Sequence, residues 1–327
     1  MKKPAHRSPL LLLLTFSALP FFTSCGAGAP DFLEFDAPRF NLPPGTVKPL
    51  DVYGIKSGKE GPQKTLLSES LQFSSDRPDE FSIDSNGILS LSSGLLAGET
   101  AGITVRHRGR EAVLTVMVRP DREATIDADA VLRRPEALDS LVNKERFLPE
   151  AFVPEDLVRI SVPTILTFEE VNHLRLPAAE ALKELFEAAW AEAGLNLYAR
   201  SGYRSYETQR GLYQAAVARD GQEWADRYSA VPGSSEHQTG LAMDITAESV
   251  RFQLEEAFGA TLEGRWVAEN AHRFGFILRY LPGKEDITGY NYEPWHLRYV
   301  GEPAAAEIYQ RGLTLEEFYD LPEEETE

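Results

Sequence analysis

The sequence predicts an all-β N-terminal unit followed by an α+β unit in which helices flank a small antiparallel sheet. Three observations lead to this prediction. Residues 30–120 consist of short apolar runs separated by turn residues, which is typical of a β-sandwich. The residues after about position 140 combine longer helical patterns with short apolar strands, as α+β domains do. The length of 327 residues corresponds to about two domains.

Residues 1–25 have the features of a lipoprotein signal peptide. A basic start is followed by an apolar stretch over residues 10–22, which is too short for a transmembrane span. The run Phe22-Thr23-Ser24-Cys25 resembles a bacterial lipobox, although phenylalanine stands where leucine is usual. We therefore expect lipidation at Cys25 and an exported, membrane-anchored lipoprotein on the periplasmic or outer face of a bacterial cell. The alternative is ordinary signal cleavage that leaves Cys25 unpaired.

Charge and cysteine content limit the possible partners. The net charge is −18, and no basic stripe is available to neutralise phosphates, so nucleic acid is not an expected partner. No second apolar segment reaches 18 residues, so membrane contact is expected only through the N-terminal anchor. Cys25 is the only cysteine, which excludes an internal disulfide. We expect a monomer.

Residues 30–120 contain two hairpin candidates. They are Phe81–Ile83 with Ile88–Leu91 around Asn86-Gly87, and Ile103–Arg106 with Val113–Val118 around Arg108-Gly109. Asn-Gly favours a type I′ turn. The run 73–118 resembles a bacterial immunoglobulin-like domain of the Big-2 type, which implies a spacer or wall-binding role. His107 is expected on the strand surface.

The second unit is expected over residues 141–318, after a charged linker or first helix at 121–140. Its predicted helices are Pro177–Ala193 ended by Gly194, 206–219 capped by Ser205, and Trp266–Phe274 ended by Gly275. Capping residues at the starts and glycines at the ends indicate these limits. Residues 319–327 form an acidic tail, and we expect its last five residues to be disordered.

His237 and Asp244 form the first candidate ligand pair. They lie seven residues apart with Gly240 between them, a spacing that fits a loop leading into a strand over residues 241–245. Ionised carboxylates are rarely buried in an apolar strand without a partner. A divalent cation would be such a partner for Asp244, whereas a salt bridge or exposure to solvent is the simpler alternative.

Glu293 and His296 form the second pair. Pro294 argues against a helix here, and the run Trp295–Val300 predicts a strand. Taken alone, His296 could be a hydrogen-bonded core histidine. Catalytic zinc sites, however, use three protein ligands and leave one position open. The two histidines and Asp244 provide such a set, and Glu293 is left over as a carboxylate that could act as a base.

Four segments together resemble the VanY-like D-alanyl-D-alanine carboxypeptidases. These zinc peptidases belong to the superfamily that includes lysostaphin-type peptidases and the hedgehog signalling domain. The family patterns L-V-N-K-x-x-x-L-P, S-G-Y-R-S-x-x-x-Q, S-x-H-x-x-G-x-A-x-D and E-x-W-H occur at Leu141–Pro149, Ser201–Gln209, Ser235–Asp244 and Glu293–His296. The match covers roughly residues 140–312 and implies the hedgehog/D-Ala-D-Ala-peptidase-like fold.

The resemblance implies roles for individual residues. His237, Asp244 and His296 would be the zinc ligands, and Glu293 would be the general base. Arg204 would pair with a substrate carboxylate or oxyanion. The residues that would line the pocket are Gln209, Ser235, Tyr213 and Trp295. The position of Arg204 before a predicted helix N-terminus also favours an anion there, because free N–H groups and the helix dipole attract negative charge.

The expected activity is hydrolysis of the C-terminal D-alanine bond in peptidoglycan stem peptides by a zinc-activated water. Three alternatives stay open. An L,D-carboxypeptidase or an endopeptidase acting on the same peptides would share these motifs. A non-catalytic zinc-containing binding protein is also possible on this scaffold, although the presence of Glu293 and Arg204 favours an enzyme.

Overall fold

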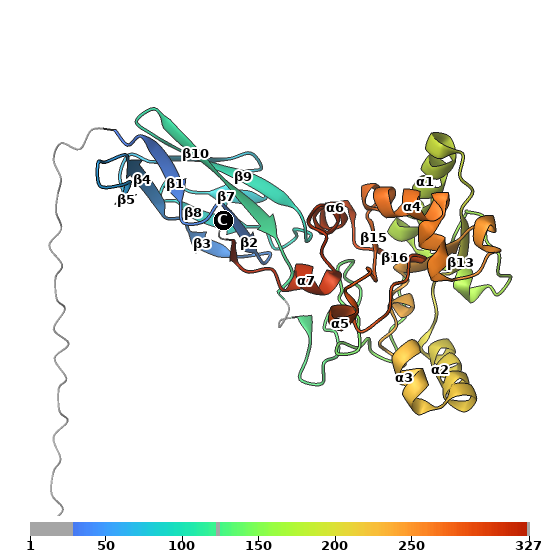
Figure 1. Cartoon of the computed structure of the whole chain (residues 1–327). Helices are drawn as coiled ribbons and strands as arrows, with labels where there is room; N and C mark the ends of the chain where they lie inside the picture. The colour runs from blue at the N-terminus through green and yellow to red at the C-terminus, as the bar shows by residue number, and fades with distance from the viewer. Residues whose placement is uncertain (1–28, 122–124, 326–327) are drawn as a thin grey trace, which may run out of the picture.

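A computed structural model describes residues 29–121 and 125–325. The predicted signal peptide and Cys25 lie outside these residues. Figure 1 shows a β-rich part, blue to green, beside a part that mixes helices with short strands, yellow to red. Both fold-class predictions are confirmed: the N-terminal part is all-β and the C-terminal part is α+β. Within the described residues, no helix is long and apolar enough to cross a membrane.

The N-terminal part contains three sheets that share one apolar core. Their strand orders are β1-β4-β5, β3-β8-β7 and β17-β2-β10-β9-β6, where β17 (Glu324–Glu325) comes from the end of the chain. The strands are β1 (Phe32–Phe35), β2 (Arg39–Leu42), β3 (Val47–Pro49), β4 (Val52–Lys56), β5 (Gln63–Leu67), β6 (Gln72–Ser75), β7 (Phe81–Ile83), β8 (Ile88–Leu91), β9 (Thr100–His107) and β10 (Arg110–Val118). Alternating side chains such as Ile103 and Val105 on β9 point into the core, as strand geometry requires.

Both predicted hairpins form, but only one uses the type I′ geometry. Arg108 and Gly109 both have positive φ, at 48° and 79°, as a type I′ turn requires. At the other hairpin only Gly87 is positive, so the turn prediction there was wrong. The reason is Asp84, whose Oδ1 accepts hydrogen bonds from two backbone N–H groups of the turn and holds a longer connection. His107 is buried and not on the surface, with Nδ1 3.2 Å from a backbone oxygen.

The C-terminal part is organised around an antiparallel sheet of order β13-β14-β16-β15. These strands are β13 (Tyr198–Ser201), β14 (Ala242–Thr246), β15 (Phe276–Leu278) and β16 (His296–Tyr299), and a separate pair joins β11 (Leu157–Arg159) to β12 (His173–Arg175). Apolar residues of the sheet pack against α1 (Leu176–Ala193) and α4 (Leu262–Asn270). Because β14 lies in the middle of this sheet, it is buried along its whole length.

The predicted helix limits hold closely for two of three helices. α1 ends at Gly194, which is left-handed with φ 67°, and Ser205 caps α2 (Tyr206–Asp220). The third helix starts earlier than predicted, because Thr261 caps α4 by accepting from Gly264 N. The remaining helices are α3 (Gln222–Tyr228), α5 (Glu285–Thr288), α6 (Glu302–Arg311) and α7 (Leu315–Tyr319).

The segment 126–140 has no helix and consists of turns and single β-bridges. Ile126 and Leu132 pair across one bridge and pack against Val142 and Leu148. This segment is therefore attached to the C-terminal part through apolar contacts.

The chain end returns to the N-terminal part. Phe318 and Tyr319 of α7 pack with Met117 of β10 in one buried cluster, and β17 (Glu324–Glu325) pairs with β2. The expected disorder of the acidic tail is wrong for residues 323–325, since Lys48 lies 2.9 Å from Glu323. Ion pairs and backbone pairing offset the repulsion between the clustered carboxylates.

Candidate active site

The central strands of the C-terminal sheet bring the three predicted metal ligands together. Asp244 on β14 lies directly opposite His296 on β16 in the strand register. His237 lies on a short 3-10 turn, and Gly240, left-handed with φ 67°, connects that turn to β14. One potential ligand atom from each side chain lies within 4.8 Å of the others, and all three residues are buried.

Hydrogen bonds give each histidine one outward and one inward nitrogen. His237 Nδ1 lies 2.7 Å from Gly202 O, and His296 Nε2 lies 3.3 Å from Glu236 Oε2. The opposite nitrogens face Asp244: His237 Nε2 at 3.4 Å and His296 Nδ1 at 2.9 Å. Acceptors behind both rings are typical of metal-binding histidines, because they orient the inward nitrogens.

The charge states at this cluster suit a cation. Burial and the nearby Arg204 lower the pKa of His237 to about 4, so its ring is neutral and donates from Nδ1 to the Gly202 carbonyl. Its Nε2 lone pair then faces a carboxylate whose pKa the two histidines hold well below its usual range despite burial. Two electron-pair donors facing each other in a buried site repel unless a positive charge lies between them.

The His296 ring brings a positive charge to this cluster. Burial lowers its pKa, but the hydrogen bonds to Asp244 and Glu236 outweigh that effect and raise the pKa to about 9. The ring therefore carries a proton toward Asp244 at neutral pH. A metal ion that binds there must displace this proton.

Glu293 lies beside the three clustered residues, at the open side. Its Oε2 is 3.9 Å from His296 Nδ1, and its side chain keeps 27% of its surface exposed. Burial raises the pKa of Glu293 to about 7, although the His296 charge acts in the opposite direction. A carboxyl group with such a pKa can both take up and release a proton near neutral pH.

A pocket of about 260 Å³ opens over these residues. Its lining residues are Arg204, Gln209, Ser229, Ala230, Ser234, Ser235, Glu236, His237, Asp244, Leu254, Tyr280, Tyr290, Glu293, Trp295 and His296. Three of the four predicted pocket residues are among them. Tyr213 is not among them. Its hydroxyl contacts Asp226 and the Gln222 amide, and these contacts join α2 to α3. The prediction that Tyr213 lines the pocket was wrong, because its face of α2 packs toward α3.

Arg204 supplies the cation of the pocket. Its Nε is buried without a hydrogen-bond partner, and within the described ranges it forms no ion pair with a carboxylate. The predicted anion site at the N-terminus of α2 is already taken, however. Glu170 accepts from Ser205 N and from the Thr208 hydroxyl, both at 2.6 Å. The guanidinium, and not the helix end, is thus available to a ligand.

Gln209 has one satisfied and one free end. Its Nε2 donates to Ala230 O at 2.7 Å, and its Oε1 is buried without a partner. Since it lines the same pocket as Arg204, the pocket offers a free donor and a free acceptor. Such groups are costly to bury unpaired, so both fit a polar ligand.

Sequence reasoning missed several residues of the site. Glu236 stands at an unspecified position of the His237 motif, and Tyr280, Tyr290 and Glu170 belong to no predicted motif. Only Glu236 left a signal, as an acidic residue directly before a candidate ligand. The histidines His173 and His272 lie outside the cluster and contact Glu169 O and the Tyr309 ring.

Comparisons with known proteins identify the family of the chain. The family model for VanY, described as D-alanyl-D-alanine carboxypeptidase, matches residues 171–302. The putative carboxypeptidase YodJ of Bacillus subtilis is 48% identical over 199 residues, which is 60% of this chain and 71% of that protein. A D-alanyl-D-alanine carboxypeptidase of Enterococcus faecalis is 44% identical over 146 residues, which is 42% of this chain and 52% of that protein.

The chain is also similar to a solved carboxypeptidase structure. The structure of the LdcB LD-carboxypeptidase aligns with a TM-score of 0.57 and 46% identity, covering 60% of this chain and 91% of that chain. The matched family region includes β14, β16 and all three residues of the His-Asp-His cluster. The chain belongs to the VanY family of D-alanyl-D-alanine carboxypeptidases.

Proposed function

We propose that this protein is a zinc carboxypeptidase that removes the terminal D-alanine of peptidoglycan stem peptides. One observation carries the proposal: a buried His-Asp-His cluster lies in the same pocket as an unpaired arginine. The cluster suits a metal ion and the arginine suits a free carboxylate. Together they fit a peptide that ends inside the pocket.

The donor set favours zinc. Two imidazoles and one carboxylate form a common zinc ligand set with one position left open. Soft thiolate donors are absent from the cluster, since the only cysteine of the chain is Cys25. When bound, the ion would polarise the scissile carbonyl and lower the pKa of a water molecule.

Glu293 would handle the protons of the reaction. Its position at the open side of the cluster, 3.9 Å from His296 Nδ1, lets it take a proton from an attacking water. The same carboxyl group can return that proton to the departing amine nitrogen. With its pKa raised to about 7 by burial, it is suited to both steps.

Arg204 and Gln209 would orient the end of the peptide. The guanidinium can pair with a terminal carboxylate through two parallel hydrogen bonds. The free Oε1 of Gln209 can accept from a substrate N–H group. Ser235 and Trp295 line the same pocket, and we assign them to contacts with the terminal residues.

Two substrate specificities fit this site. A D,D-carboxypeptidase shortens a pentapeptide, and an L,D-carboxypeptidase shortens a tetrapeptide. The likeness to the LdcB LD-carboxypeptidase structure supports L,D-carboxypeptidase activity as the alternative. Incubation with penta- and tetrapeptide muropeptides, followed by mass spectrometry, distinguishes the two. A zinc-loaded protein that releases D-alanine from neither would indicate a binding protein or an endopeptidase, and detection of internally cleaved fragments separates these last two.

The membrane anchor is a proposal of the sequence alone. Lipidation at Cys25 would tether the enzyme at the cell surface, near its substrate. Labelling with a palmitate analogue in a bacterial host should mark the wild type and not Cys25→Ser. Equal labelling of both proteins would show that Cys25 is not the lipidated residue.

A further inference from the structure

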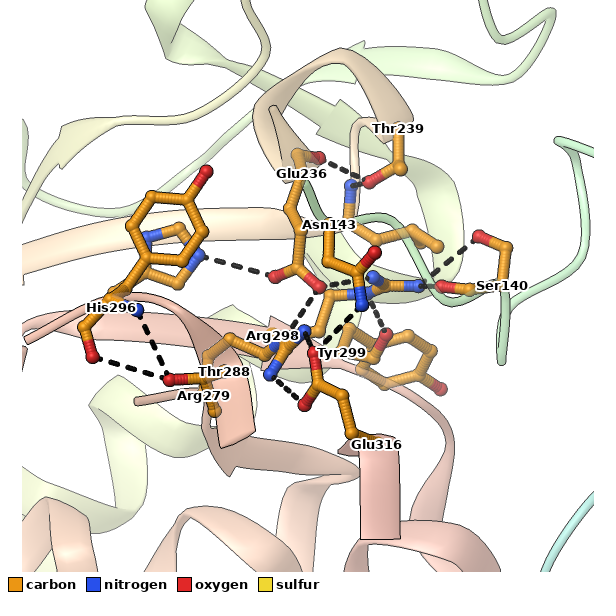
Figure 2. A network of polar contacts seen from close by, with 12 residues as sticks. Ser140, Asn143, Glu236, Thr239, Arg279, Thr288, His296, Arg298, Tyr299 and Glu316 are labelled. Atoms are coloured by element: carbon orange, nitrogen blue, oxygen red, sulfur yellow. Dashed lines mark hydrogen bonds and ion pairs between the residues drawn. The ribbon is translucent and has the colours of Figure 1, made fainter. Parts of the chain in front are cut away.

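Glu236 lies between a predicted metal ligand and two buried arginines. Figure 2 shows its carboxylate with His296 on one side and the arginines on the other. Oε2 faces His296 Nε2 at 3.3 Å. Oε1 accepts from Arg279 Nε at 2.7 Å and from Arg298 Nη1 at 2.8 Å. The side chains of Glu236 and of both arginines have no exposed surface.

The arginines are themselves held from several directions. Arg279 donates from both terminal nitrogens to Glu316 of α7, at 2.8 and 2.6 Å. Arg298 Nη2 donates to the Ser140 carbonyl at 2.6 Å. Two buried arginines thus face two carboxylates, which balances the charge. Such a network is rigid when its groups are satisfied, so the position of the Glu236 carboxylate is closely defined.

The carboxylate decides which nitrogen of His296 carries a proton. Once the proton between Nδ1 and Asp244 is lost, a hydrogen bond from Nε2–H to Glu236 leaves Nδ1 with its lone pair directed at the Asp244 side of the ring. This carboxylate–histidine arrangement fixes the tautomer and the ring orientation of a metal ligand. The turn that carries His237 therefore also carries the group that orients His296.

We propose that Glu236 is a positioning residue of the metal site, which holds His296 with Nδ1 free for the ion. This inference rests on the proposed zinc function. The competing explanation is that Glu236 serves only to neutralise two buried arginines. Glu316 offers a matched control, because it pairs with Arg279 inside the same network but does not contact His296.

The test compares Glu236→Gln with Glu316→Gln in the full chain. Both substitutions remove one buried negative charge from the network, so both should lower the melting temperature. Zinc affinity, measured by competition with a chromogenic chelator, should fall about 10- to 100-fold in E236Q and stay near the wild-type value in E316Q. Equal affinity losses in the two variants, or none in E236Q, would overturn the positioning role.

A measurement on the wild type keeps the inference testable if E236Q does not fold. In zinc-loaded protein with ¹⁵N-labelled histidine, NMR should show His296 protonated at Nε2 and without a proton at Nδ1. A proton at Nδ1 would contradict the proposal. If the wild type binds no zinc, the proposed function fails as well. If it binds zinc and releases D-alanine while E236Q binds zinc equally well, only the role of Glu236 is overturned.

Discussion

The two folded parts of the molecule treat charge in opposite ways. In the N-terminal part the core is apolar, with Leu42, Ile103 and Val116 fully buried, and ion pairs such as Lys64–Glu34 lie on the surface. In the C-terminal part Glu236 and Arg279 form an ion pair with no exposed surface. Burial of ions costs several kcal/mol each, and pairing at best repays it. Both parts have an apolar core that provides stability, and the C-terminal interior adds buried charges that we assign to the orientation of a site.

The largest expected effect is on catalysis in the C-terminal interior. Glu293→Gln should lower kcat/KM about 100- to 10,000-fold, since a general base contributes a factor of that size, and it should leave zinc affinity in place. Steady-state release of D-alanine from muropeptides measures the loss. Glu269→Gln, on the exposed side of α4, is the control and should keep wild-type turnover. Normal turnover of E293Q would contradict the base assignment.

Metal removal should affect one part and spare the other. Zinc at 1,000 times its dissociation constant adds about 4 kcal/mol to stability, so a strong chelator should lower the melting temperature. Hydrogen exchange should accelerate in β14 and β16 and stay unchanged in β9 and β10. His237→Ala should make the protein insensitive to the chelator. A uniform acceleration across both parts would show that their stabilities are coupled.

Truncation of an apolar side chain in the N-terminal core should lower stability and leave zinc binding unchanged. Leu114 is fully buried on β10, and Leu114→Ala should cost about 2–5 kcal/mol of unfolding free energy. Zinc affinity should not change, because the substitution is remote from the metal site. The neighbouring Val113 is 59% exposed, so Val113→Ala is a matched control with little cost. Urea unfolding and zinc titration of both variants test the contrast, and a loss of zinc affinity in L114A would break it.

The smallest effect is expected for a surface ion pair. Arg106 and Glu111 lie 2.6 Å apart, with side chains 59% and 49% exposed. Solvent screening makes such pairs worth little, so Arg106→Ala should leave the melting temperature within measurement error. A large decrease would show that charge also stabilises the N-terminal part.

Local patterns predicted the elements that carry the site. Ser205 as a cap and Gly194 as a stop marked helix limits, and Pro294 separated Glu293 from a strand. Those signals act within a few residues of the chain, where backbone geometry and capping decide the structure. For the same reason the motif spacings were enough to identify three candidate ligands and a candidate base.

Predictions failed where a distant residue decided the outcome. Glu170, 35 residues before Ser205, occupies the helix end that was expected to bind an anion. Residues 324–325 pair with β2, although their acidic composition alone predicts disorder. The Tyr213 hydroxyl contacts Asp226, and Tyr213 does not line the pocket.

The sequence by itself determined the two fold classes, the ligand types and the order of the motifs, because residue chemistry and short-range periodicity are properties of the chain. Only the tertiary structure decided that Asp244 faces His296 across two strands and that Arg279 and Arg298 enclose Glu236. These partners are 43 to 62 residues apart. Their contact depends on strand register and on the burial of charge, which no local pattern specifies.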